Sequence, residues 1–144
     1  MINAKERQFI RCIRQGLNVK QISKELNIPK STAYLIYNNL IQKDILKNSH
    51  FVSYDKLGYN YRIFVALKVL PDDRTNLKNH LLNHERVNSV HFINSGYDYH
   101  FDAIFENSKV ASDFVDSLKE QFEIVDIRIY NVVDTISQEK CLLH

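Results

Sequence analysis

Apolar residues recur every three or four positions in three stretches of the N-terminal third of the chain, and this spacing predicts three amphipathic helices. The first predicted helix runs from Ala4 to Gln15. Asn3 is placed as its N-cap, Glu6 three residues later completes a capping box, and Gly16 is a typical C-terminal stop. The start of the chain therefore predicts one well-delimited helix with an apolar face turned toward a small core.

A shorter and a longer helix follow, separated by a tight break, and this is the layout of a helix-turn-helix. Asn18 and Gln21 form a second capping-box pair at the start of the shorter helix. That helix stops before Pro29, because proline cannot continue it and disfavours the α conformation of the preceding residue. The longer helix starts near Lys30, and its inward stripe consists of Ala33, Ile36, Tyr37 and Leu40.

The opposite face of the longer helix carries amide and hydroxyl groups that suit hydrogen bonds to base edges, and Leu35 suits contact with a thymine methyl group. A solvated helix face is the alternative, but apolar side chains among the amides favour a contact surface. Three lysines suit contact with backbone phosphates: Lys20 and Lys30 at the starts of the shorter and the longer helix, and Lys47 just beyond the longer one. The predicted DNA-binding residues are Lys20, Lys30, Ser31, Thr32, Tyr34, Leu35, Asn38, Asn39 and Lys47.

After Asp44 the apolar period changes from about 3.6 residues to two. Ile45–Leu46 and Phe51–Val52 flank residues 47–50, and this pattern predicts a small hairpin or wing. The sequence YDKLGY at residues 54–59 then forms the predicted hinge between two modules.

The second half of the chain alternates strand and helix patterns. The predicted strands are Tyr61–Leu70, Val87–Asn94, Tyr99–Glu106 and Ile124–Ile136. A helix carrying Leu77 and Leu81 joins the first two strands, and a helix capped at Asn107 joins the last two. This βαββαβ order predicts an α+β chain with a ferredoxin-like antiparallel sheet, both of whose helices lie on one face. The predicted domains are 1–53 (helix-turn-helix), 54–60 (linker), 61–137 (assembly and effector domain) and 138–144 (C-terminal tail).

The face of the sheet that the helices leave uncovered is expected to be apolar. It should carry Phe64, Ala66, Leu70, Ile104, Tyr130 and Val132. A patch of that kind rarely stays open in a soluble protein, so a second copy is expected to cover it in a two-fold dimer. The predicted interface residues are Phe64, Ala66, Ile104 and Arg128, and Arg62, His100 and Asp102 are expected to supply paired charges among them.

Charge separates the two halves more sharply than the net value of +2 indicates. Residues 1–50 hold nine Lys and Arg against three Asp and Glu, whereas residues 51–144 hold ten against fourteen. A basic front module is the candidate for binding a polyanion. The chain shows no apolar stretch long enough to span a bilayer and no secretory leader, and Cys12 and Cys141 lack metal-binding spacing. These features favour a cytoplasmic protein that does not engage a membrane.

No catalytic, metal-binding or cofactor-binding arrangement emerges from the sequence. His80 and His84 have the i, i+4 spacing of two metal ligands, but no third ligand accompanies them, so a half-exposed helix face is the favoured interpretation. His100 and Asp102 lie two apart on one strand without a nucleophile nearby, so a contact between subunits is favoured over acid–base chemistry. No glycine-rich phosphate loop is present.

The chain resembles the leucine-responsive regulator/AsnC family of transcription factors over nearly its whole length. In the front half the resemblance rests on ISKELNIPKSTAYLIYNNLIQKDIL and YDKLGY, and in the rear half on VNSVHFINSGYDYHF and RIYNVV. The resemblance implies a winged helix-turn-helix on double-stranded DNA, homodimers that in this family often assemble into octamers or larger rings, and regulation by an amino acid or similar effector. It carries the effector region over to Gly96, Tyr97, Asp98, Tyr130, Asn131 and Val132.

Turn geometry is the alternative role for Gly96, and a turn carboxylate that bonds its own backbone is the alternative for Asp98. Two alternative functions also stay open. One is an enzyme on the same scaffold, similar to a family of haem-pathway decarboxylases, whose signature after the second strand is not visible here. The other is an assembly protein whose front module binds protein in place of DNA.

Overall fold

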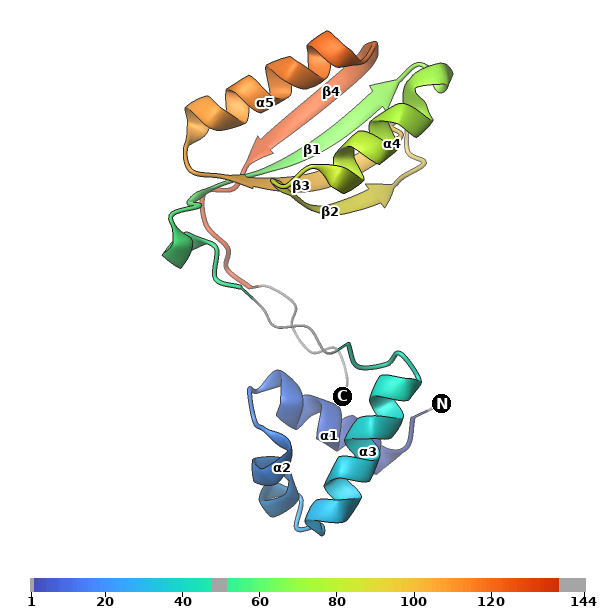
Figure 1. The fold of residues 1–144 in the computed structure, drawn as a ribbon, viewed down its shortest axis with the longest axis vertical. Helices are drawn as coiled ribbons and strands as arrows, with labels where there is room; N and C mark the ends of the chain where they lie inside the picture. The colour runs from blue at the N-terminus through green and yellow to red at the C-terminus, as the bar shows by residue number, and fades with distance from the viewer. Residues whose placement is uncertain (1, 48–51, 138–144) are drawn as a thin grey trace. The chain divides into compact units, whose positions relative to one another are not determined.

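The computed structural model describes residues 2–47 and 52–137 (Figure 1). The chain divides into two compact units, an N-terminal one and a second one that spans Val52–Thr135. Each unit has its own hydrophobic core.

Three helices form the N-terminal unit: α1 (Ala4–Arg14), α2 (Val19–Glu25) and α3 (Lys30–Gln42). Both predicted capping boxes are present. The Asn3 side chain accepts the Glu6 N–H at 2.8 Å and Glu6 Oε2 accepts the Asn3 N–H at 2.7 Å, while Asn18 and Gln21 repeat the exchange at 3.0 and 2.9 Å. These reciprocal bonds fix the first turns of α1 and α2 because they satisfy N–H groups that have no partner inside a helix.

The ends of these helices follow the predicted stop signals. Gly16 has φ +86° just beyond α1, which ends at Arg14, one residue earlier than expected. Asn27 takes φ +49° between α2 and α3, and α3 begins directly after Pro29 without a side-chain cap. Positive φ is tolerated by glycine and asparagine, so both residues suit the breaks that they form.

The core of the unit is small and apolar. Its buried members are Phe9, Ile10, Cys12, Ile22, Ala33 and Leu40. Ala33 and Leu40 are buried and Ile36 and Tyr37 partly so, which confirms the predicted inward stripe of α3. Glu6 lies at the edge of this core and pairs with Lys43 at 3.4 Å, which ties the start of α1 to the end of α3.

The second unit is built on a four-stranded antiparallel sheet. Its strands are β1 (Tyr61–Val69), β2 (Val87–Phe92), β3 (Tyr99–Phe105) and β4 (Ile124–Asn131), in the spatial order β2-β3-β1-β4. Helices α4 (Arg74–Asn83) and α5 (Ser108–Gln121) cover the same face of the sheet (Figure 1). The short 3₁₀ helices η1 (Asp55–Leu57) and η2 (Pro71–Asp73) precede β1 and α4. The predicted α+β class and βαββαβ order are confirmed.

Alternation along β1 positions the core. Ile63, Val65, Leu67 and Val69 are all buried against α4 and α5, which contribute Leu77, Leu81, Ala111, Phe114, Val115 and Leu118. The intervening residues of β1 point to the other face, as the period of two requires.

Three expectations about element ends are wrong or fall outside the description. The last strand ends at Asn131 and not at Ile136, because its partner β1 begins at Tyr61 and Asn131 already lies opposite Ile63. The second strand ends at Phe92, two residues before Asn94. The turn of the predicted wing, at residues 48–51, lies outside the described residues, and residues 45–47 and 52 beside it are not in a strand. Among the described residues, no helix is long and apolar enough to cross a membrane.

Candidate nucleic-acid interface and effector region

The outward face of α3 is exposed. Tyr34 is 43% exposed and Leu35 60% exposed, and Ser31 and Asn38 are exposed beside them. Within the described residues, no hydrogen bond engages the side chains of Ser31, Tyr34 or Asn38. Asn39 and Thr32 lie at the margins of the face and are half-buried. This face therefore presents free hydrogen-bonding groups and one large apolar side chain to an external surface.

Positive charge flanks this face. Lys20 in the first turn of α2, Lys30 at the first position of α3 and Lys47 beyond its end are all exposed. None of the three is ion-paired with another described residue, whereas Lys43 is held by Glu6. The uncapped start of α3 adds N–H groups and the positive end of the helix dipole next to Lys30.

The predicted effector turn is tied to the sheet by Asp98. Its carboxylate is buried, accepts the Val69 N–H at 3.0 Å through Oδ2 and pairs with Arg74 Nε at 2.9 Å through Oδ1. The Asp98 N–H donates to the Leu67 carbonyl at 2.8 Å, and the Asp98 carbonyl accepts the Ile93 N–H at 2.9 Å. Gly96 takes φ +91° in this turn. Gly96 therefore has the positive φ of its alternative role in turn geometry. The Asp98 carboxylate does not bond the backbone of its own turn; its partners lie in β1 and α4, so its role here is structural in a way that the sequence did not predict.

Tyr97 in the same turn faces β4. Its hydroxyl donates to Asp126 Oδ2 at 2.8 Å, and this hydrogen bond raises the pKa of the tyrosine above its usual value. The Arg128 guanidinium lies 5.8 Å from the centre of the Tyr97 ring. Tyr130 and Asn131 further along β4 are exposed, and Val132, which follows the strand, donates its N–H to the Arg62 carbonyl at 3.0 Å. The turn therefore contacts β4 through Tyr97, at Asp126 and Arg128.

The uncovered face of the sheet is less open than expected. Ala66 and Ile104 are already buried within one chain, and Phe64, half-buried, stacks on His100 with ring centres 5.6 Å apart. Arg62 pairs with Asp102 at 3.7 Å, and Asn88 donates to the same carboxylate at 3.1 Å. Tyr54, Tyr59 and Ile104 are among the residues that line a hollow of about 320 Å³ on this side of the unit. Leu70 and Tyr130 remain exposed.

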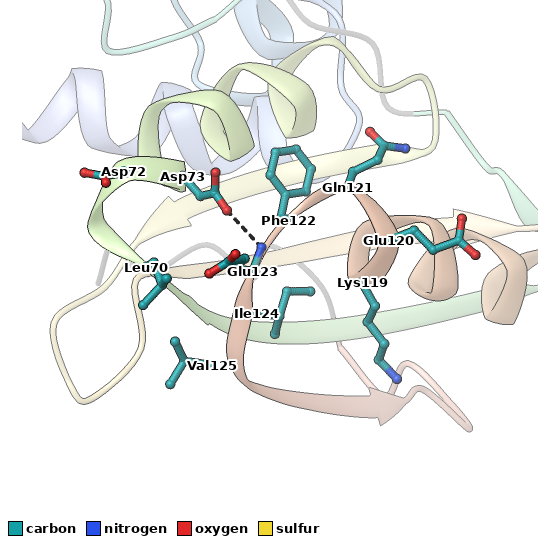
Figure 2. A pocket seen from close by; sticks show the side chains of 10 residues that line it. All are labelled: Leu70, Asp72, Asp73, Lys119, Glu120, Gln121, Phe122, Glu123, Ile124 and Val125. Atoms are coloured by element: carbon teal, nitrogen blue, oxygen red, sulfur yellow. Dashed lines mark hydrogen bonds between the residues drawn. The ribbon is translucent and has the colours of Figure 1, made fainter.

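A larger hollow of about 870 Å³ lies at the end of β1 and the start of β4 (Figure 2). Four acidic residues line it, namely Asp72, Asp73, Glu120 and Glu123, with Lys119 as the only basic one. Asp73 Oδ2 accepts the Glu123 N–H at 2.8 Å, so one carboxylate serves to hold the start of β4. Sequence reasoning did not find this hollow, because it assembles chain segments 50 residues apart. Its negative charge makes it unsuited to nucleic acid.

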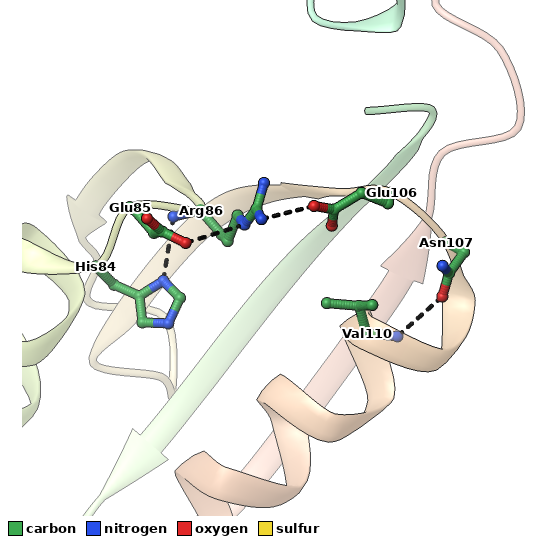
Figure 3. Close-up of polar contacts among 6 residues, drawn as sticks. All are labelled: His84, Glu85, Arg86, Glu106, Asn107 and Val110. Carbon is green, nitrogen blue, oxygen red and sulfur yellow. Dashed lines mark hydrogen bonds and ion pairs between the residues drawn. The ribbon is translucent and has the colours of Figure 1, made fainter. Parts of the chain in front are cut away.

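His80 of α4 and His84, which directly follows the helix, pack against aromatic rings. The rings of His80 and His84 are 5.6 Å apart, and each meets an aromatic edge, Phe122 for His80 and Phe114 for His84. Figure 3 shows that His84 Nδ1 accepts the Arg86 N–H, at 3.2 Å, while the Arg86 side chain pairs with Glu106 at 2.6 Å. Burial lowers the pKa of His84, and the neighbouring His80 adds to the shift. The described residues contain no group of three or more potential metal ligands.

The fold and its two candidate surfaces define a class of protein: a helical module with an exposed contact helix, joined to a βαββαβ module. Neither a protein-family model nor a curated protein matches the sequence. Solved structures do match. The Neisseria meningitidis transcriptional regulator NMB0573, in complex with L-Met, is 16% identical with a TM-score of 0.86, over 96% of this chain and 94% of that one.

Two further structures show the same likeness. AsnC from E. coli is 13% identical with a TM-score of 0.83, over 98% of each chain. An AsnC family transcriptional regulator from Agrobacterium tumefaciens is 11% identical with a TM-score of 0.83, over 95% of this chain and 94% of that one. The chain therefore has the fold of the leucine-responsive regulator/AsnC family, as its resemblance to that family predicts.

Proposed function

We propose that this chain is a sequence-specific DNA-binding transcriptional regulator of the leucine-responsive/AsnC type, and not an enzyme. The observation that carries the proposal is the outward face of α3, whose hydrogen-bonding groups are exposed and have no partner among residues 2–47 and 52–137, with exposed lysines in α2, at the start of α3 and just beyond its end. The full-length likeness to solved transcriptional regulators supports it. In this proposal residues 1–53 form a winged helix-turn-helix, 54–60 the linker, 61–137 the assembly and effector domain and 138–144 a tail.

The proposed binding mode places α3 in the major groove. Ser31, Thr32, Tyr34, Leu35, Asn38 and Asn39 meet the base edges, since an α-helix fits that groove and its side chains reach the bases there. Lys20, Lys30 and Lys47 contact phosphates on either side, together with the free N–H groups at the start of α3. Such contacts set the position and strength of binding, while the face of α3 sets its sequence preference.

We propose that the βαββαβ module joins two copies of the chain in a dimer. Phe64, Ala66, Ile104 and Arg128 lie on the sheet face that no helix covers, and we place a two-fold dimer contact there. A dimer presents two α3 helices to half-sites about one helical turn of DNA apart. Further association to octamers is part of the same proposal, as is a cytoplasmic location with access to the chromosome.

An amino acid or similar small molecule is the proposed effector. The solved complex of NMB0573 with L-Met supports this class of ligand. The proposed binding region holds Gly96, Tyr97, Asp98, Tyr130, Asn131 and Val132. The Asp98 carboxylate is occupied by Val69 and Arg74, and the Tyr130 side chain has a hydrogen bond with Arg128. Tyr130 and Asn131 are nevertheless both exposed, and we propose that a ligand meets their side chains.

A salt titration tests the proposal. The chain should bind duplex DNA at low ionic strength, and the logarithm of its binding constant should fall linearly with the logarithm of salt concentration, by about 0.9 per phosphate contacted. Lys30→Ala and Lys47→Ala should weaken binding to all duplexes equally and make the slope shallower. Lys78→Ala, an exposed lysine of α4, is the matched control and should leave the slope unchanged. Absence of binding to every duplex at low salt would refute the proposal.

A further inference from the structure

The base-reading face of α3 has an unusual composition for a surface that meets DNA: it carries no charge. From Ser31 to Gln42 the helix contains no Lys, Arg, Asp or Glu. At about 100° per residue, its outward positions fall within an arc of about 100°. The residues in that arc are Ser31, Tyr34, Leu35, Asn38 and Gln42. They offer a hydroxyl, a phenol, two amides and an isobutyl group.

These groups differ in the bases that they can distinguish. Guanine is read mainly through its O6 and N7 atoms by arginine or lysine, and the N4 amino group of cytosine by an acidic side chain. The face has neither. Asparagine and glutamine form paired hydrogen bonds with N6 and N7 of adenine, and apolar groups contact the thymine methyl, whereas serine accepts any base.

The lysines near the face do not supply the missing guanine contact. Lys30 lies about 100° around the helix from Ser31, at the margin where phosphates pass. Lys43 is held by Glu6 at 3.4 Å, on the side of α3 that packs against α1. Lys20 belongs to α2 and Lys47 lies beyond the end of α3. None of these four lysines is therefore among the residues of the reading face.

We propose that α3 directs the protein to A·T pairs, with Asn38 bonding an adenine and Leu35 packing on the methyl group of a nearby thymine. This inference rests on the proposed function and adds the sequence class of its DNA. Leu35 and Asn38 are three residues apart, so they are neighbours on the helix surface. They lie about 4.5 Å apart along the axis, close to the 3.4 Å step between bases of one strand. Adjacent or next-but-one base pairs are within their reach.

The experiment begins with the full-length chain and a pool of duplexes that carry a random core. Bound duplexes are recovered and sequenced, and A·T pairs should be enriched at two or three neighbouring positions of each half-site. In the recovered duplex each thymine is then replaced singly by uracil, which removes only the C5 methyl group. At one thymine this replacement should weaken binding of the duplex about 3- to 5-fold, which corresponds to the free energy of burying one methyl group.

Variants assign these contacts to residues. Leu35→Ala should weaken binding by a similar factor and abolish the uracil effect at that position, because the methyl group has then lost its partner. Asn38→Ala should weaken binding about 5- to 100-fold and abolish the effect of 7-deazaadenine, which lacks N7, at one adenine. Leu82→Ala is a matched control, since Leu82 of α4 is 60% exposed like Leu35, and Asn76→Ala, an exposed asparagine of the same helix, is the second.

The outcomes separate the two proposals. Enrichment of G·C pairs, or uracil substitution without effect at every thymine, overturns the A·T inference while DNA binding stands. Failure to bind any duplex at low salt overturns both. Because uracil and 7-deazaadenine change only the DNA, the test holds even where a protein variant folds poorly.

Discussion

Asp98 links three elements through a single buried carboxylate. It holds the 93–98 turn to the end of β1 through the Val69 N–H and to the start of α4 through Arg74. The neighbouring glycine needs its positive φ for the same turn. A carboxylate with these partners stabilises the unit whether or not an effector is bound.

Asp98→Ala should lower the free energy of unfolding by about 2–4 kcal/mol, since it leaves the Val69 N–H buried without a partner and removes the ion pair. Arg74→Ala should cost about 1 kcal/mol or less, because the Arg74 side chain is 45% exposed. Urea unfolding of both variants measures the difference. If Asp98→Ala were as stable as the parent chain yet lost its response to an amino acid, the carboxylate would be a ligand group and not a structural one.

Residue-level details were predictable where their partners are close in sequence. Both capping boxes join residues three apart, so Asn3 and Asn18 could be assigned from the sequence alone. The partners of Asp98 could not be predicted in this way, because Val69 is 29 residues away and contacts it only once β1 and the turn have come together. The acidic hollow of Figure 2 was not predictable for the same reason, since its lining residues lie far apart in the sequence.

At the scale of elements, two ring contacts join the end of α4 to α5 and the residue after α5: His80 with Phe122, and His84, which follows α4, with Phe114. His84 must be neutral to accept the Arg86 N–H at Nδ1, and burial lowers its pKa below the usual 6.5. Its ring meets Phe114 of α5 with centres 4.7 Å apart, and His80, Glu85 and Arg86 are the titratable groups around it.

This shift makes stability depend on pH. The unfolded chain takes up a proton on His84 as pH falls below 6.5, before the folded chain does, so the free energy of unfolding should fall from that point downward. Above 6.5 the contribution is fully present. Urea unfolding midpoints are measured at about pH 7.5 and about pH 5.5. The difference between the two midpoints should be smaller for His84→Gln than for the parent chain. His91 is exposed, so His91→Gln is the control and should show the same difference as the parent chain. Equal differences in all three proteins would contradict this role of His84.

Periodicity located the α-helices and strands of the described residues, because the buried stripe of each is encoded locally, but it did not predict the short 3₁₀ helices η1 and η2. The ends of strands were less accessible. β4 ends at Asn131, and because β1 begins at Tyr61 it could pair with two residues beyond Asn131 at most; no local signal at residues 132–136 marks that limit. The hollow beside the uncovered sheet face also could not be predicted locally, because it brings Tyr54 and Tyr59 together with Ile104, which is 45 or more residues away in the chain.

At the scale of the whole molecule, the proposed dimer depends on the sheet face around Phe64. Phe64→Glu would place a carboxylate in the subunit contact, where a buried unpaired charge costs several kcal/mol, and should weaken the dimer about 100-fold or more. Phe64→Ala should weaken it less. Sedimentation equilibrium measures both, with Leu82→Glu on the exposed face of α4 as the control. A parent chain that sediments as a single subunit would contradict the dimer, as would a Phe64→Glu variant that folds and dimerises as the parent does.

The separation of roles between the two modules follows from their charge and their exposed groups. Residues 1–50 hold the basic excess and the exposed face of α3, and residues 51–144 hold the acidic excess and the proposed effector turn. DNA contact should therefore be confined to the first module.

The most direct test of this claim is a map of DNA contact on the full-length chain. Backbone amide resonances of the ¹⁵N-labelled protein are recorded at low ionic strength before and after addition of the recovered duplex. The largest shifts should fall on residues 18–47, and above all on the outward positions of α3 from Ser31 to Gln42. Shifts confined to residues 52–135, or an unchanged spectrum, would contradict the account.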